Sequence, residues 1–378
     1  MQKKKIAFLL LSLLVLNNAY GQTTDLKLQE KIDTIINRYM KATNIVGLSI
    51  GIVRNNQSYY AKGYGTINLQ TNKPVDTLTN FHAASISKLF TATAIMQLVE
   101  QGKLDINNKL VYYLPAFKMK DERVKDITLT QLLNHTSGIP DINDYNWDHP
   151  NNSKHALKHF VLPSKFSTLS FTPGTDIHYS NPAFDILGYI VEKTANQSFE
   201  EYEYEKVLKP AGMTHSSFDL AKIDPARKST PHIIDSISKK VEISKVYPFN
   251  KEHSPCGTLN TCSHDLSKWM LEMLSIYNDS TDSYHGVIRR ETLLQMWTPT
   301  HNIAYPGLFL CLAWWKRESK EYGNYFFHVG VDVGYSCSLT LFPDKGLGIV
   351  VLCNGDYPGL PVYRDIPLEI ARLLTENK

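Results

Sequence analysis

The stretch HAASISK at residues 82–88, followed by an apolar run that ends at Gln101, decides how we interpret this sequence. Ser85 and Lys88 are three positions apart, and on a helix this spacing places both side chains on one face. The run is apolar or small at nearly every position, which predicts a buried helix that Gly102 ends. The sequence therefore predicts a serine hydroxyl in the first turn of a central helix, beside a lysine amine.

A second copy of the tetrapeptide shows that Ser-x-x-Lys alone is not specific. SISK recurs at residues 236–239, in a β-prone or loop-like stretch with no apolar helix after it. Because only the first copy precedes a predicted buried helix, we select Ser85 and not Ser236 as the candidate nucleophile.

The composition is that of a globular chain with no unusual charge. The 378 residues are 43% hydrophobic and carry a formal net charge of +3, enough for one large core or two modest lobes. No Lys/Arg block follows Lys3–Lys5, so no nucleic-acid surface is expected. Five cysteines are too few for a disulfide scaffold in a chain of this length, and we assign no pairing.

The amino terminus is typical of a secretory signal peptide. Three lysines at residues 3–5 precede an almost wholly apolar run over 6–16, and small residues precede Gly21. The run is too short to span a membrane, and no cysteine follows it, so we expect no stable membrane anchor. The sequence predicts a signal peptide over residues 1–21 and a secreted or periplasmic protein. The alternative is a retained N-terminal anchor.

The order of predicted elements indicates an α+β fold. Strand-like segments occur near both ends of the chain, and short helices joined by Pro, Gly, Asn and Asp lie between about residues 110 and 254. This predicts one catalytic domain over 22–378, with an antiparallel sheet flanked by terminal helices and an inserted, mostly helical lobe. The α/β lobe would comprise about 22–110 and 290–378, and the helical lobe about 111–289. The predicted helices are 26–40, 129–135, 155–160, 182–194, 199–208, 265–276, 290–297 and 366–374, and the predicted strands are 46–53, 59–65, 308–315, 325–331, 335–342 and 348–353.

Three further stretches carry candidate site residues. The first, Thr128–Pro140, contains His135, which we interpret as a capping or core histidine. The second contains Tyr179-Ser180-Asn181, although Tyr322-Gly323-Asn324 fits Tyr-x-Asn equally well and is typical of a tight turn. The third is His328-Val329-Gly330 on a strand, where a glycine indicates close approach by another group, including a ligand.

Together these motifs resemble those of a known superfamily. The ordered set is Ser-x-x-Lys at a helix start, Leu-Leu-x-His-Thr-Ser-Gly at 132–138, Pro-Gly-x-x-x-x-Tyr-Ser-Asn at 173–181, and the late His-x-Gly. It resembles the serine β-lactamase and penicillin-binding-protein superfamily, on the class C β-lactamase branch. That branch also holds D,D-peptidases, D-aminopeptidases and carboxylesterases. The resemblance extends from about residue 25 to the end of the chain.

The resemblance implies a catalytic role for Ser85, Lys88 and Tyr179. Ser85 would form an acyl-enzyme, with Tyr179 as general base and acid and Lys88 as its electrostatic partner. Free lysine and tyrosine titrate near pH 10, so we expect both pKa values to be lowered in the site. Asn181 would orient the substrate amide or the Lys88 amine. The backbone N–H groups of Ser85 and Val331 would form the oxyanion hole.

His328 departs from the pattern that this resemblance implies. Relatives that act on β-lactams typically carry lysine there, on a Lys-x-Gly strand that helps to hold the substrate carboxylate. A histidine of ordinary pKa is mostly neutral at pH 7 and attracts a carboxylate less. With Gly330 and Val331, His328 is still expected to contact substrate, but the departure favours ester, amide or D-amino-acid peptide substrates. A second departure is Ser254–Leu259, where relatives tend to have Gly-Gly and Cys256 stands instead.

The leading hypothesis is a secreted serine hydrolase that acts on an amide or ester (β-lactam, D-amino-acid peptide or carboxylic ester) through acyl-Ser85. The competing hypothesis is a penicillin- or cell-wall-peptide-binding protein that is acylated without turnover. A metal-dependent hydrolase is disfavoured, because the 13 histidines are scattered and no His-Glu-x-x-His occurs. The expected partner is a small-molecule or peptide substrate, with cell-wall peptide among the candidates, and neither a cofactor nor a metal is implied.

Overall fold

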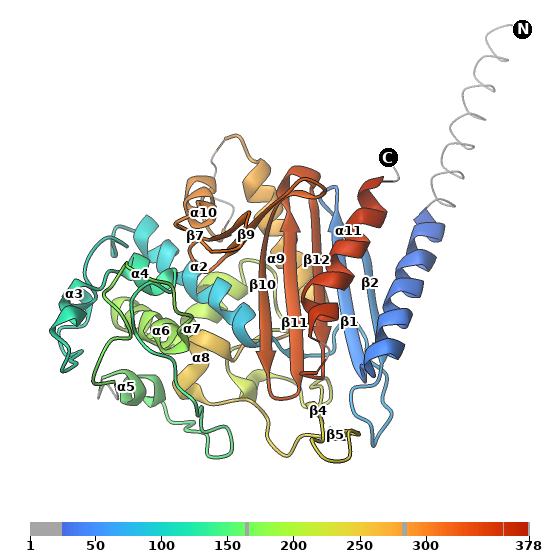
Figure 1. The fold of residues 1–378 in the computed structure, drawn as a ribbon, viewed down its shortest axis with the longest axis horizontal. Coiled ribbons are helices and arrows are strands. Elements are labelled where there is room, and N and C mark those ends of the chain that lie inside the picture. The colour runs from blue at the N-terminus through green and yellow to red at the C-terminus, as the bar shows by residue number, and fades with distance from the viewer. Residues whose placement is uncertain (1–24, 163–165, 282–285, 358, 377–378) are drawn as a thin grey trace, which may run out of the picture.

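An antiparallel sheet connects the two ends of the chain in the computed structural model (Figure 1). The structure describes residues 25–162, 166–281, 286–357 and 359–376, so the predicted signal peptide lies outside the described residues. In these ranges no helix is both long and apolar enough to cross a membrane. The sheet order is β2 (Gln57–Gly65), β1 (Gly47–Arg54), β12 (Leu347–Cys353), β11 (Tyr335–Phe342), β10 (Gly323–Asp332), β9 (Trp315–Ser319), β8 (Leu308–Leu310) and β7 (His301–Asn302).

Local sequence explains most of these strands. β11 and β12 are buried at every position, as expected for strands covered on both faces. The β1–β2 turn is formed by Asn55 and Asn56, whose φ angles of 52° and 59° suit a two-residue hairpin turn. The strand predicted over 308–315 was wrong, because the chain turns between β8 and β9. There Ala313 has a φ of 62° and donates its N–H to the Leu133 carbonyl, away from the sheet.

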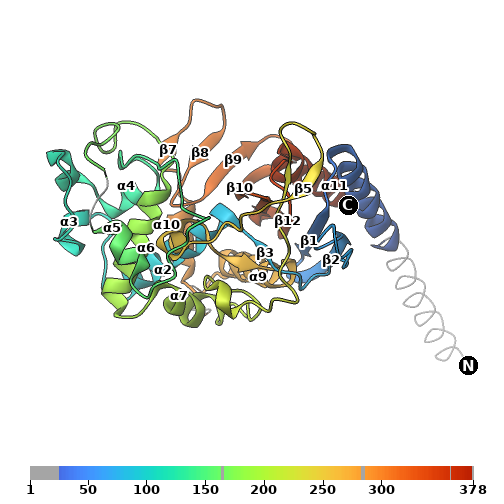
Figure 2. The same ribbon diagram turned by 90° about the horizontal axis from the view of Figure 1, so that it is seen from below.

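Helices cover both faces of the sheet, as Figures 1 and 2 show. On one face lie the N-terminal helix (residues 25–43) and α11 (Ile366–Glu376), which share a buried cluster with β1 and β12. Asp33 fastens the N-terminal helix to β2, because it accepts hydrogen bonds from Tyr60 at 2.5 Å and Tyr64 at 2.6 Å. α9 (Ser263–Asn278) packs against β1 and β12 on the other face, although we expected this segment in the helical lobe. The predicted α+β class and the sheet built from both termini are confirmed.

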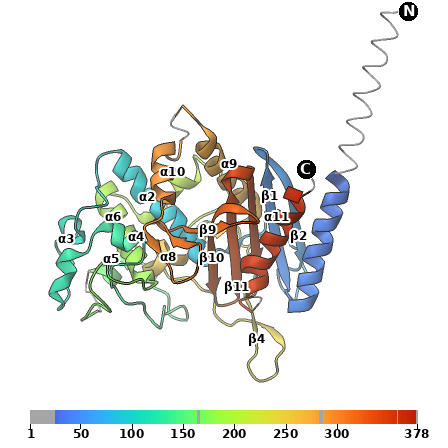
Figure 3. The same ribbon diagram turned by 45° about the horizontal axis from the view of Figure 1, so that its top comes forward.

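A group of helices lies beside the sheet, around α2 (Ser87–Glu100), as Figure 3 shows. α2 is buried from Ser87 to Leu98 and packs against α6 (Asn181–Ala195) and α8 (Ser254–Gly257). The other helices here are α3 (Leu110–Tyr113), α4 (Leu129–Leu133), α5 (Ala156–Val161), α7 (Phe199–Tyr202) with a π-helical continuation over Glu203–Leu208, and α10 (Arg290–Trp297).

Two small sheets complete the architecture. β3 (Phe81–His82) pairs with β6 (Asn260–Thr261), and this pairing brings the segment just before Ser85 next to residues 259–261. β4 (His232–Ile234) pairs with β5 (Val241–Ile243), and the second SISK copy lies in the loop between them. Ile237 in that copy is 90% exposed, so its context is an open turn, as the sequence indicated.

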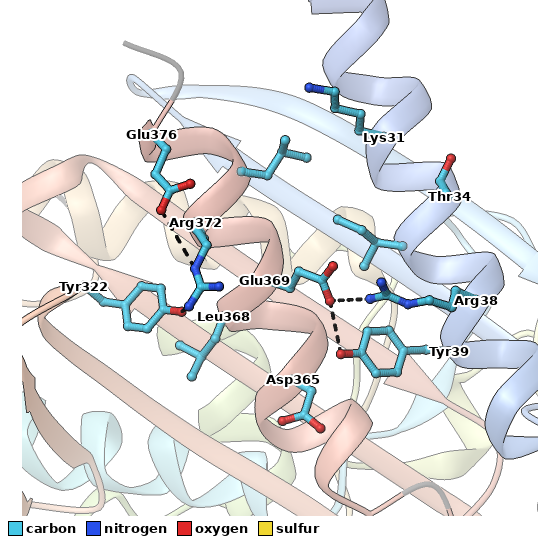
Figure 4. A pocket seen from close by; sticks show the side chains of 12 residues that line it. Lys31, Thr34, Arg38, Tyr39, Tyr322, Asp365, Leu368, Glu369, Arg372 and Glu376 are labelled. Carbon is cyan, nitrogen blue, oxygen red and sulfur yellow. Dashed lines mark hydrogen bonds and ion pairs between the residues drawn. The ribbon is translucent and has the colours of Figure 1, made fainter.

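A cavity of about 780 Å³ lies between the N-terminal helix and α11, and neither Ser85 nor Tyr179 lines it (Figure 4). Charged groups that already have partners line it, for example Glu369, which accepts hydrogen bonds from Arg38 and Tyr39. Tyr322 lies here too, on the turn that leads into β10. The second Tyr-x-Asn motif therefore lies in a turn, and its tyrosine lines a different cavity from the one that Ser85 lines.

Candidate active site

Ser85 lies in a 3₁₀ turn, η1 (Ala84–Ile86), directly before α2 begins at Ser87. We expected it in the first α-helical turn; it lies one turn earlier, because the chain enters from β3 with Ala84 at a φ of 47°. This left-handed conformation is unfavourable for alanine and is held by neighbouring backbone, since Ala83 donates its N–H to the Leu259 carbonyl at 2.8 Å. Ser85 is half-buried in this turn, between the buried residues Ala84 and Ile86.

Lys88 is the buried cation of the site. Its side chain is fully buried, and its Nζ donates to Ser85 Oγ at 2.9 Å, Asn181 Oδ1 at 2.6 Å and the Cys256 carbonyl at 2.7 Å. These acceptors use all three N–H groups of the ammonium, which is the condition under which a buried charge is tolerated. The structure thus brings Ser85 and Lys88 together as their spacing predicted.

Tyr179 lies against both groups. The Lys88 Nζ is 5.0 Å from its ring centroid, and its hydroxyl interacts with Ser85 and Lys88. Burial raises the pKa of Tyr179, and the positive charge of Lys88 offsets this only in part. Burial opposes the charge of Lys88, but its interactions with Tyr179 and Cys256 outweigh this effect and raise its pKa. Our expectation that both pKa values are lowered was wrong: at neutral pH the pair is an ammonium and a neutral phenol.

Asn181 begins α6, and Ser180 caps that helix by accepting the Ala183 N–H at 3.2 Å. With its Oδ1 on Lys88, Asn181 donates from Nδ2 to Tyr145 Oη at 2.6 Å and to Asp141 Oδ2 at 3.2 Å. Of the two roles expected for Asn181, the contact with the Lys88 amine is present in the structure.

Two neutral histidines lie close to Tyr179. His135 stacks on its ring at 4.2 Å, and its Nδ1 accepts the Ser180 N–H at 3.2 Å. His328 lies 6.4 Å from the Tyr179 ring, and its Nδ1 donates to the Val329 carbonyl at 2.7 Å. Burial and the charge of Lys88 lower the pKa of His135 well below its usual value and that of His328 to about 3. His328 is only 1% exposed and uncharged at neutral pH, so its position does not favour the expected contact with a substrate carboxylate.

Gly330 lets β10 approach the serine turn. A Cβ atom there would lie 2.2 Å from the Ala83 carbonyl oxygen, so the close approach that its sequence indicated is to protein backbone. The next residue, Val331, is 44% exposed and lines a cavity of about 200 Å³ together with Ser85 and Asn181. The two segments that carry the expected oxyanion-hole N–H groups therefore pack directly on each other.

Sequence reasoning missed several residues of this cavity. Tyr145 and Trp147 line one part of it with stacked rings 5.2 Å apart, and they come from a loop without a recognisable pattern. Asp332 lines it too and accepts a 2.6 Å hydrogen bond from His82 Nε2. Asp185 could have been found, because a carboxylate within the apolar stretch of α6 is unusual. It is fully buried and accepts from His253 Nδ1 at 2.8 Å.

Asp185, His253 and Cys256 could also hold a metal ion, since their ligand atoms lie within 4.8 Å of one another. Burial, with nearby Asp185, raises the pKa of the Cys256 thiol well above its usual value, which disfavours the thiolate that metals need. The hydrogen-bonded pair of Asp185 and His253 also accounts for the contact between the two groups without an ion. We therefore interpret this cluster as packing beneath Lys88.

Known proteins resemble this chain over most of its length. Protein flp of Staphylococcus aureus is 29% identical over 329 residues, which are 86% of this chain and 63% of that protein, so the chain spans less than two thirds of this relative. A beta-lactamase of Pseudomonas fluorescens is 24% identical over 364 residues, 88% of this chain and 94% of that protein. Among solved structures, the octameric penicillin-binding protein homologue from Pyrococcus abyssi superposes with a TM-score of 0.76 at 24% identity, covering 91% of this chain and 77% of that one.

The fold is shared with the solved homologue, and the family model extends across both the sheet and the helices around α2. The sequence model of the Beta-lactamase family matches residues 32–372, and the chain belongs to this family.

Proposed function

We propose that the protein hydrolyses a small amide or ester through an acyl intermediate on Ser85. The observation that carries this proposal is the 2.9 Å contact between Ser85 Oγ and Lys88 Nζ, with Ser85 at a cavity of about 200 Å³. A serine hydroxyl needs a neighbour that takes its proton and a site for the developing negative charge. Tyr179 with Lys88 supplies the first, and the packed backbone segments at Ser85 and Val331 supply the second.

The protonation states of Lys88 and Tyr179 determine the order of the steps. In the resting pair Lys88 is charged and Tyr179 is protonated, so the pair must lose one proton before it can accept that of Ser85. Ser85 Oγ then bonds to the substrate carbonyl carbon as its proton passes to the pair. Collapse of the tetrahedral intermediate breaks the bond to the leaving group, which takes the proton back. A water molecule repeats both steps on the acyl-serine ester, releases the acid and restores Ser85.

The substrate class follows from the charges around this cavity. His328 is buried and neutral, so it offers no cation to the C-terminal carboxylate of a peptide or to that of a β-lactam. We therefore favour esters, amides and those D-amino-acid peptides that carry no free carboxylate beside the scissile bond over β-lactams as substrates. Secretion through the predicted signal peptide over 1–21 is part of the same proposal.

Intact-mass spectrometry tests the acyl intermediate. The protein is mixed with p-nitrophenyl acetate or with a fluorescent penicillin, and a covalent adduct is expected on the native chain and not on Ser85→Ala. Ser236→Ala is the matched control, since it removes the serine of the exposed SISK copy and should keep the adduct. An unchanged adduct on Ser85→Ala would refute the proposal.

Release of p-nitrophenol distinguishes hydrolysis from simple binding. Continuous turnover beyond one equivalent is expected of a hydrolase. A single stoichiometric burst without further release would instead identify a penicillin- or peptide-binding protein that is acylated and does not turn over.

A further inference from the structure

Two histidines lie next to each other at the surface, near the start of α9. His264 is the second residue of α9, and His215 lies in the loop that follows the π-helical segment after α7. Their ring centroids are 6.0 Å apart, and the ring planes are inclined at 64°. His215 is exposed, and the side chain of His264 is 44% exposed. Neither histidine lines the cavity at Ser85, so this pair is separate from the candidate active site.

Asp265 connects the two histidines. It is fully buried in the first turn of α9. Its Oδ2 accepts the backbone N–H of His215 at 2.7 Å and the hydroxyl of Ser216 at 2.8 Å. Its Oδ1 lies 3.2 Å from His264 Nδ1, in hydrogen-bonding geometry. One carboxylate therefore fixes the backbone that carries one imidazole and the ring of the other.

The separation of the two rings suits a shared divalent metal ion. Imidazole nitrogens bind zinc at about 2.0–2.1 Å, so two imidazoles on one ion have ring centroids roughly 5–6.4 Å apart, depending on the angle at the metal. The observed 6.0 Å lies in this range. A histidine that binds a metal usually donates its other ring N–H to a carboxylate or carbonyl oxygen, and Asp265 Oδ1 offers this acceptor to His264 Nδ1. Nε2 of His264 is then the nitrogen that faces the ion.

The neighbouring groups define the ligand set. Cys262 is close, because a ligand atom from each of Cys262, His264 and Asp265 lies within 4.8 Å of the others. Its side chain is fully buried, whereas the two rings are exposed, so we leave the thiol out of the set. Lys268 Nζ is 4.0 Å from Asp265 Oδ1 and donates to the Gly212 carbonyl at 2.7 Å. This positive charge has its own acceptor, and it weakens the attraction of the site for a cation.

We propose that His215 and His264 form a surface site for a divalent transition-metal ion such as zinc, with Asp265 orienting His264 and water in the remaining positions. Imidazole suits zinc, copper and nickel, whereas magnesium and calcium prefer oxygen ligands. The ion cross-links the loop at His215 to α9. Ser216 Oγ in this loop is 2.7 Å from Thr261 Oγ1 on β6, the strand that pairs with β3 just before the serine turn. The role of the ion is structural, and the inference does not depend on the proposed function.

Calorimetric titration of the untagged full chain with zinc chloride tests the site. The native protein is expected to bind one equivalent of zinc. Loss of the partner that orients a ligand typically costs about 10–100-fold in metal affinity, and loss of a ligand should cost at least as much. We therefore expect His215→Ala and His264→Ala each to weaken binding tenfold or more. Both side chains are exposed, so neither change should prevent folding.

His159→Ala is the matched control. His155 and His159 form a second histidine pair at the start of α5, with ring centroids 6.1 Å apart, but no described carboxylate contacts either ring. The His159→Ala variant should bind zinc as the native protein does. A native protein that binds no zinc would overturn the inference. So would a titration in which His159→Ala loses the binding while His264→Ala keeps it.

Stability provides a second measurement. An ion that binds only the folded state stabilises it, so excess zinc should raise the urea midpoint of the native protein and of His159→Ala. The midpoint of His264→Ala should not change. An equal rise in all three proteins would mean that the ion binds elsewhere, and no rise in the native protein would mean that it does not cross-link the loop to α9. Either result would overturn the inference.

Discussion

Replacing Gly330 with alanine should separate the two backbone segments that carry the proposed oxyanion-hole N–H groups. The added Cβ would lie 2.2 Å from the Ala83 carbonyl oxygen and 3.2 Å from Ala84 Cβ, whereas ordinary contacts begin at 3.4 Å. Both neighbours belong to the strained turn before Ser85, and neither is the flexible end of a side chain. Either β10 or this turn must therefore move by about 1 Å to relieve the overlap.

A displacement of this size has different effects on activity and on stability. Misplacing reacting groups by about 1 Å can lower the rate on the order of 100-fold, and loss of one oxyanion donor costs roughly as much. Overpacking a core position destabilises by roughly 1–3 kcal/mol. We therefore expect Gly330→Ala to lower kcat for p-nitrophenyl acetate about 100-fold while the protein still folds.

The assay combines steady-state kinetics with urea unfolding, and kcat is expressed per folded molecule. Gly348→Ala is the control, because a Cβ there would lie 2.8 Å from Val53 Cγ2 and 3.0 Å from Leu341 Cδ2, on strands away from Ser85. It should lose stability and keep kcat. If Gly330→Ala keeps more than half of the native kcat, the close packing of β10 on the serine turn does not position the catalytic groups.

Two pH dependences follow from the buried groups. Burial raises the pKa of Tyr179, so the form that can accept a proton becomes more abundant with rising pH, and kcat/KM should increase between pH 7 and 9. Tyr179→Phe should abolish this rise and lower kcat about 100-fold or more, whereas a flat native profile would contradict a base role for the pair. The second concerns stability: the unfolded chain protonates histidine near pH 6.5, but His328 in the folded protein only near pH 3. The folded state is therefore destabilised as the pH falls from about 6.5 towards 3, by up to about 1.4 kcal/mol per pH unit from His328. Urea unfolding between pH 7 and 4.5 should show a shallower loss for His328→Gln, and equal slopes would exclude this group.

Much of the fold was predictable because the relevant patterns are local. Apolar residues such as Leu28, Ile32 and Ile36 recur at helical spacing in the N-terminal helix and are all buried. β11 runs from Tyr335 to Phe342 as predicted, since its ends are marked by turn residues on either side. The strand predicted over 308–315 was wrong because the break at Ala313 depends on a hydrogen bond to Leu133, far away in the sequence.

The candidate site, like the fold, has some residues that local motifs predict and others that only tertiary packing brings in. Ser85, Lys88, Tyr179 and Asn181 belong to short motifs, and the structure brings all four together. Tyr145 and Asp332 are on no motif: Asp332 lies 250 positions from its partner His82, and only the packing of β10 beside β3 makes them neighbours. No local pattern records a contact between segments so distant.

The sequence alone determined that a serine hydroxyl and a lysine amine share one end of a buried helix, because a spacing of three and an apolar run dictate that geometry. Tertiary structure decided the charge state of each group around them. The pKa of Lys88 is raised because its interactions with Tyr179 and Cys256 outweigh its burial, and the pKa of His328 is lowered because burial beside Lys88 disfavours its charged form. Asp332 meets His82 at 2.6 Å only because β10 lies beside β3 in the folded chain, and no local pattern of either segment records that contact.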